Sequence, residues 1–154
     1  NKEKGDEHIL EKAFMNITSL RNHSNIQFEL FDQLPIGLFS GAVCKENKIF
    51  NTGYIDLWGK NQDDNSLNIF ELKDKNNRKA GIISELFFYA NIAFDLLHQI
   101  DNIKLNSEEC EYRGYKEFIS LRNSNVNAWF LVDKLHPSIE EHEEKLINIL
   151  NMKN

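Results

Sequence analysis

The chain has 154 residues, of which 41% are hydrophobic and 27% are charged, so we expect residues 1–154 to fold as one globular domain. A net charge of −6 argues against tight binding to bare duplex DNA, because Lys and Arg supply most non-specific affinity. The two cysteines exclude a disulfide framework or a Cys-rich zinc site, and no apolar signal segment or membrane span is visible, so we expect a soluble, cytoplasmic protein.

The first predicted element is a helix over the N-terminal residues. Apolar side chains recur at spacings of three and four from Ile9 to Leu20, and Asp6 can cap the helix. Glu7 and Glu11 lie one turn apart on it. Glu11 borders the apolar stripe and is the favoured accessory site residue, with a solvated helix face as the alternative for both. Residues 26–31 fit a strand or a helix.

Three strands are expected next. Residues 36–43 and 48–58 are predicted to pair around a polar turn at 45–47. A polar loop at 59–66 then leads to a third strand over 67–73. We expect an antiparallel meander, in which the ends of the second and third strands lie close together.

The remaining elements are a long helix, further strand and a last helix. Residues 80–100 are apolar around much of their circumference, which predicts a helix buried on more than one side, with a homodimer contact through it as one option. The run at 128–132 is typical of an inner strand, with 118–121 beside it. After Pro137, a capping box of Ser138 and Glu141 predicts a helix whose inner face carries Leu146, Ile147 and Leu150.

Two of these strands carry charge where a purely structural strand would carry an apolar residue. Side chains alternate along a strand, so Glu71 and Lys73 project to one side. If the second and third strands pair, Asp56 joins that face. Two carboxylates beside an ammonium predict a divalent-metal site, whereas an isolated Glu-x-Lys is more often a solvated pair.

Asp56 followed by Glu-x-Lys at 71–73 resembles the PD-(D/E)XK nuclease superfamily, best over residues 36–100. The resemblance implies an α/β fold with a restriction-endonuclease-like core, a central mixed sheet flanked by helices in the order αβββαβ. Ile55 replaces the Pro of the motif. In the RecB-like Gln-x-x-x-Tyr pattern, Glu85 replaces Gln before Tyr89, so a contact to nucleic acid through an amide donor cannot be made in the same way.

The resemblance also implies an activity, hydrolysis of phosphodiester bonds, most simply of DNA. Asp56, Glu71 and the Leu72 carbonyl would bind Mg²⁺, with Mn²⁺ as an alternative, while Lys73 would either activate the attacking water or stabilise charge on the phosphate. Glu11, Glu85 and Tyr89 are accessory candidates. Glu85 would either touch the site lysine or an outer-shell water, or point to solvent near the start of its helix, and the alternative for Tyr89 is a core residue with its hydroxyl hydrogen-bonded.

The basic residues beside the Glu-x-Lys strand are candidates for substrate binding. They are Lys75, Arg78 and Lys79. A solvated turn is the alternative for this run. Two other functions stay open for the whole chain: an inactive nuclease-fold module that binds nucleic acid or regulates, and a dimerising interaction domain.

Overall fold

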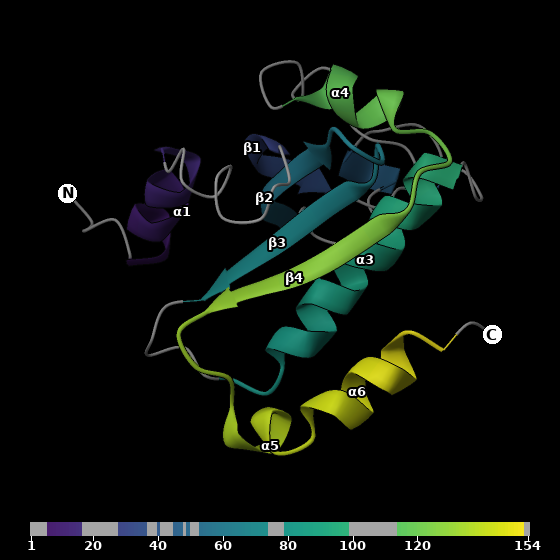
Figure 1. The fold of residues 1–154 in the computed structure, drawn as a ribbon. Helices are drawn as coiled ribbons and strands as arrows, with labels where there is room; N and C mark the ends of the chain where they lie inside the picture. Colours follow the sequence, from purple (N-terminus) through teal and green to yellow (C-terminus); the bar gives the residue numbers. More distant parts are fainter. Residues whose placement is uncertain are drawn as a thin grey trace.

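The computed structural model describes residues 6–16, 28–36, 40, 45–47, 49, 53–73, 79–98 and 114–152. These residues form an α/β fold around a mixed four-stranded sheet with strand order β1-β2-β3-β4 (Figure 1). β1, β2 and β3 pair antiparallel, and β4 pairs parallel to β3. The strands are β1 (Phe28–Ile36), β2 (Gly53–Asn61), β3 (Leu67–Lys73) and β4 (Val126–Val132).

The third predicted strand is confirmed, and residues 28–31 of the segment left open between strand and helix form the start of β1. β1, β2 and β3 form an antiparallel meander. β1 ends at Ile36, where the predicted strand was to begin, and Ser40 is a bend; residues 37–39 and 41–44 lie outside the described residues. Ile49 is also a bend, so β2 starts at Gly53 and continues to Asn61. The polar turn at 45–47 is a short 3₁₀ helix, η1 (Lys45–Asn47), whose Asn47 carbonyl accepts a bond from the Ser40 amide.

Two of the helices that precede β4 in the sequence pack against the sheet. α1 (Asp6–Asn16) contacts β1 and β3, and α3 (Ile82–His98) contacts β3 and β4, crossing behind β4 in Figure 1. α3 confirms the long helix. The expectation that it is buried on more than one side is wrong, because the helix buries a single face, which carries Ile82, Leu86, Tyr89, Ile92, Ala93 and Leu97. In the part of the chain described, no helix has the length and apolar character needed to cross a membrane.

The core is centred on Trp58. Phe31 stacks on its ring at 4.5 Å, and Phe118 of α4 (Tyr115–Ser120) meets it edge-on at 5.5 Å. Gly114, which precedes α4, has φ 76°, and a Cβ there would lie 2.4 Å from Phe31 and 2.6 Å from Trp58. Only glycine meets both conditions, so this position closes α4 onto the sheet.

The C-terminal predictions need three corrections. Residues 118–121 belong to α4 and its end rather than to a strand, because Phe118 and Leu121 fall on one buried helix face. β4 is the edge of the described sheet instead of an inner strand, and Trp129 is 50% exposed. The last helix is two helices, α5 (Pro137–Glu140) and α6 (Glu143–Leu150).

The predicted capping box and inner face are also wrong. The His136 side chain, rather than that of Ser138, caps α5 by accepting a bond from the Ser138 amide. α6 buries none of its residues, and Ile147 and Leu150 are exposed. Its apolar periodicity is real, but in the described chain the helix does not pack those residues onto the sheet.

Candidate functional site

Strand register places Asp56 and Glu71 opposite one another. The last paired residues of β2 and β3 toward this end are Leu57 and Phe70, so the next residue on each strand is Asp56 and Glu71. Directly opposed residues of antiparallel strands project to the same face. The structure therefore brings together two carboxylates that are far apart in sequence.

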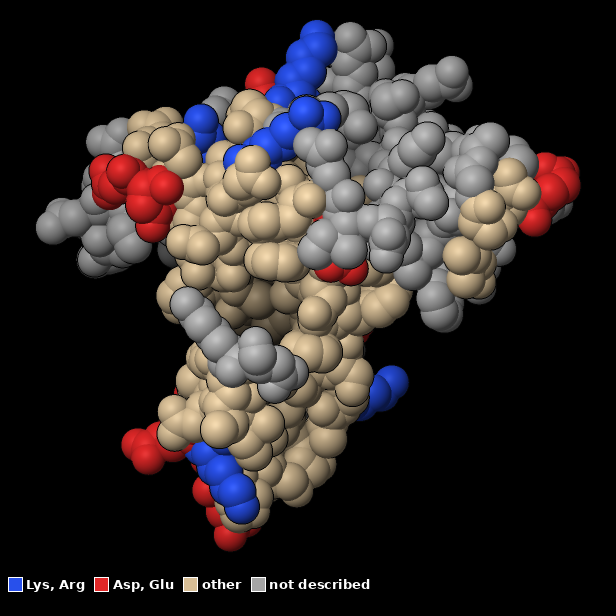
Figure 2. Space-filling view, turned by 90° about the vertical axis from the view of Figure 1, so that its right-hand side faces the viewer, with Lys and Arg blue, Asp and Glu red and all other residues tan. Residues whose placement is uncertain are grey.

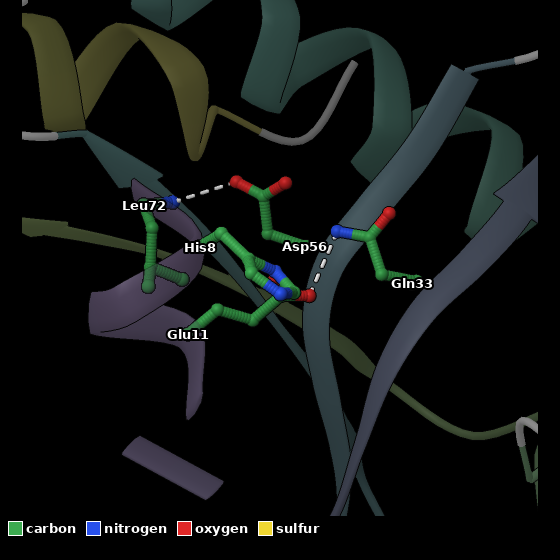
Figure 3. A network of polar contacts seen from close by, with 5 residues as sticks. All are labelled: His8, Glu11, Gln33, Asp56 and Leu72. Carbon is green, nitrogen blue, oxygen red and sulfur yellow. Dashed lines mark hydrogen bonds and ion pairs between the residues drawn. The ribbon is translucent and has the colours of Figure 1, made fainter. Parts of the chain in front are cut away.

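Asp56 is half-buried, and its side chain substitutes for a ladder partner. Its Oδ2 accepts a hydrogen bond from the Leu72 amide at 3.1 Å (Figure 3). This bond holds the carboxylate against β3 where the strands stop pairing. The amide of Leu72 is thus engaged, while its carbonyl is the group expected to face a cation.

Glu71 is 2% exposed, which is unusual for an acid. Its Oε1 accepts a hydrogen bond from Lys73 Nζ, and its Oε2 is buried with no hydrogen-bond partner among the described residues. Burial, reinforced by the negative charge of Asp56, raises the pKa of Glu71 to about 8 against the opposing pull of Lys73. A carboxyl group in this state is costly unless a cation or proton neutralises it.

Lys73 lies between two acids. Its Nζ contacts Glu71 and lies 3.4 Å from Glu85 Oε2 on α3. Burial alone would lower the pKa of Lys73, but the hydrogen bond and charge of Glu71, followed by Glu85 and Asp56, outweigh it and raise the pKa above its ordinary value. Lys73 is therefore an ammonium that donates hydrogen bonds and does not accept a proton. We call Asp56, Glu71, Lys73 and Glu85 the acid–lysine cluster.

The two accessory candidates on α3 differ. Glu85 is the exposed partner of Lys73, which fits the expectation that it touches the site lysine. Tyr89 is buried in the core, and burial, with Glu85, Glu71 and Asp56, raises its pKa to about 12, so it is a neutral phenol. A Cβ at Gly53 would lie 2.8 Å from the Tyr89 hydroxyl, so β2 and α3 approach closely here.

The third accessory candidate, Glu11, is 4% exposed, so a solvated helix face is wrong for it. Its Oε1 accepts a 2.7 Å hydrogen bond from Gln33 Nε2, and its Oε2 lies 3.1 Å from His8 Nδ1. The side chain of Glu7 lies outside the described residues. Figure 3 shows His8 and Gln33 meeting at Glu11, while the Asp56 carboxylate is turned toward the Leu72 amide.

Gln33 was missed by sequence reasoning. Asp32 and Leu34, on either side of Gln33, pair with Leu57 and Ile55 of β2. Gln33 on β1 therefore lies opposite Asp56 on β2. Its φ is 52°, a left-handed conformation that costs free energy in a residue other than glycine. Gln33 is one of several polar residues in β1, with Glu29 and Asp32, so the sequence did not single it out, and its backbone conformation could not be read from sequence.

The metal-ligand set is small. Among the described residues no group of three or more His, Cys, Asp and Glu side chains could hold a metal ion. Asp56 and Glu71, with the Leu72 carbonyl, nevertheless fit Mg²⁺, which uses one or two carboxylates and keeps waters and substrate oxygens as its other ligands. The partnerless Oε2 of buried Glu71 is the observation that favours a cation here.

The predicted substrate-binding residues are only partly visible. Lys75 and Arg78 lie outside the described residues, and Lys79 is exposed just before α3. Lys79 is therefore accessible to an anionic ligand.

Comparison with known proteins assigns neither a family nor a function to this chain. No protein-family model, curated protein or solved structure matches this chain. The function is therefore inferred from the residues and their geometry.

Proposed function

We propose that this chain is a Mg²⁺-dependent nuclease that hydrolyses phosphodiester bonds of DNA, with Mn²⁺ as an alternative metal. The proposal includes a restriction-endonuclease-like core of the PD-(D/E)XK type over residues 1–154 and a cytoplasmic location. The mixed sheet supports it, as does the order of the described elements, which follows αβββαβ apart from the added α4 and the paired C-terminal helices.

One observation carries the proposal. Glu71 is buried, one of its oxygens has no described partner, and it lies across from Asp56 with the Lys73 ammonium beside it. A structural ion pair would not need a second carboxylate, since Asp56 raises the pKa of Glu71 and so weakens the pair. A cation between the two acids removes that repulsion.

The metal would supply positive charge to the scissile phosphate and lower the pKa of an attacking water. Asp56 would bind it through a carboxylate already oriented by the Leu72 amide. Glu71 would lose its proton on binding, so affinity should increase as pH rises toward the pKa of about 8.

The protonation state of Lys73 favours a role as a hydrogen-bond donor over a role as a general base. Because its pKa is raised, it acts as an ammonium that donates to a phosphate oxygen or to the attacking water, and it does not remove a proton. Glu85 holds it from the α3 side. Lys79, exposed at the start of α3, would contribute charge toward the DNA backbone.

Plasmid cleavage tests the activity. Supercoiled DNA is incubated with purified protein in Mg²⁺ or Mn²⁺, and we expect nicked or linear product from the parent chain and at least 100-fold slower cleavage by Lys73→Met. Glu140→Gln, an exposed acid on α5, is the matched control and should cleave normally. Equal background from the parent chain and Lys73→Met would reject the enzyme.

Metal binding provides a readout independent of turnover. Titration calorimetry with Mn²⁺ should give one site that is lost in Asp56→Asn and retained in Glu140→Gln. Salt-dependent DNA binding without cleavage would favour the inactive nucleic-acid-binding module over the nuclease.

A further inference from the structure

The outer face of α3 carries apolar side chains that the domain does not bury. Phe87 is 50% exposed, Phe94 is 42% exposed and Phe88 is 39% exposed. Exposed aromatic residues on one helix face, and not scattered singly, mark an interaction surface. This face is opposite to the one that packs on β3 and β4.

The exposed residues follow a helical seam. Spacings of three and four residues link its members, which we call the α3 stripe: the exposed Ser84, Phe87, Asn91 and Phe94, and the half-buried His98. Residues at these spacings form one line along a helix and are the pattern by which two helices pack together. The stripe is therefore shaped for another helix.

Three side chains of the α3 stripe, those of Asn91, Phe94 and His98, are held in place before any partner binds. The rings of Phe94 and His98 stack at 3.9 Å, and Asn91 Nδ2 donates to the Phe87 carbonyl at 2.7 Å. Ordering these groups on binding costs less conformational entropy than ordering mobile side chains.

The surface around the stripe has few charges. Between Ile82 and His98 the only charged residues are Glu85 and Asp95. Figure 2 shows the molecule from the right-hand side of Figure 1, where a broad tan area separates Lys, Arg, Asp and Glu side chains at the upper and lower ends. α6 also has exposed apolar residues, namely Ile147, Ile149 and Leu150.

The pattern of the stripe reads nearly the same in both directions from Asn91. Phe87 and Phe94 lie four residues before and three after it, and Ser84 and His98 lie seven residues on either side. In an antiparallel two-fold pair each Phe87 would face Phe94 of the other copy. A surface that complements itself in this way suits an isologous dimer.

We propose that the α3 stripe binds a second copy of this chain, with the two α3 helices antiparallel and Asn91 near the two-fold axis. A fully buried Phe contributes roughly 150–250 Å², so three half-exposed rings per copy bury on the order of 600 Å² in the pair. That is below the ~1,600 Å² of a standard interface, even before α6 contributes. The dimer should therefore be reversible, with Kd in the micromolar range.

Sedimentation equilibrium of the full chain from about 1 to 300 μM tests the association. We expect a monomer–dimer equilibrium for the parent chain and at least a 10-fold higher Kd for Phe94→Glu. Gln62→Glu, which adds the same charge in the exposed turn between β2 and β3, should leave Kd unchanged. A parent chain that is monomeric throughout overturns the proposal and leaves the stripe to a different partner.

Cysteine cross-linking tests the geometry without depending on a destabilising substitution. In a background with Cys44 and Cys110 replaced by Ser, mild oxidation should cross-link Asn91→Cys to itself. It should also cross-link a mixture of Ser84→Cys and His98→Cys chains, but not Ser84→Cys chains alone. Self-cross-linking of Ser84→Cys would indicate a parallel pair, and no cross-link above that of Gln62→Cys would indicate no pair; either result contradicts the proposal.

Discussion

The acid–lysine cluster and the α3 stripe depart from the usual distribution of side chains in opposite directions. At the end of β2 and β3 an acid is buried with an oxygen that has no described partner, while three phenylalanines of α3 are 39–50% exposed. Both arrangements cost stability in the isolated chain. The comparison indicates that the first region is built to receive a cation and the second to receive another helix.

The largest expected effect is the pH dependence caused by Glu71. Its pKa is raised from 4.5 to about 8, so between these values the folded chain keeps a proton that the unfolded chain releases. Stability should therefore fall as pH rises through this window, by up to about 1.4 kcal/mol per pH unit. Urea unfolding from pH 5 to 8 should show this component in the parent chain and lose it in Glu71→Gln, while Mn²⁺ should flatten it.

An identical pH dependence in both proteins would mean that Glu71 titrates normally. The burial of its carboxyl group would then carry no functional meaning.

Removal of Lys73 should lower the free energy of unfolding by nearly as much as the titration of Glu71. At pH 9, above the pKa of Glu71, Lys73→Met leaves the Glu71 carboxylate buried without its ammonium partner, which we expect to destabilise the fold by about 3 kcal/mol. Lys73→Met combined with Glu71→Leu should recover most of that loss, because the uncompensated acid is then absent. Lys79→Met, at an exposed position, is the control and should change the free energy of unfolding by less than about 0.5 kcal/mol. Additive effects in the double variant would show that the two side chains are not coupled.

Gly53 links the two regions, because this residue of the site strand β2 lies against Tyr89 of α3. The added methyl of Gly53→Ala would lie 2.8 Å from the Tyr89 hydroxyl, and overpacking of this kind should cost about 2 kcal/mol. Thermal melting should show partial recovery in Gly53→Ala with Tyr89→Phe, which removes the nearest atom. Gly81→Ala, where a Cβ would meet nothing within 4 Å, is the matched control.

The smallest expected effect concerns Gln33. Both Gln33→Ala and Gln33→Gly remove the hydrogen bond to Glu11, but only glycine adopts φ 52° without strain. Gln33→Gly should therefore be more stable than Gln33→Ala by about 1 kcal/mol in chemical unfolding. Equal stabilities would show that the left-handed conformation at this position is relaxed upon substitution.

The sequence predicted the parts of the fold in which local pattern and tertiary packing agree. β3 matches the predicted range because Leu67 and Ile69 are apolar on the buried face and polar residues end the strand. α3 matches for the same reason. Residues 26–31 fit a strand or a helix from sequence alone, and pairing with β2 makes residues 28–36 a strand.

The site was predicted only as far as strand alternation reaches. Asp56, Glu71 and Lys73 follow from the alternation of side chains on two paired strands. The bond from Gln33 to Glu11 depends on how α1 lies against β1, and the apolar residues of α6 face solvent although their spacing is that of a packed helix. Neither outcome is encoded in local periodicity.

The most direct test of the proposed site is anomalous diffraction from a crystal soaked in Mn²⁺. The account predicts a peak between β2 and β3 whose distances to a carboxylate oxygen of Asp56 and to Glu71 Oε2 are both about 2.1 Å. Absence of a peak there at saturating Mn²⁺, with Glu71 still bound only to Lys73, would contradict it.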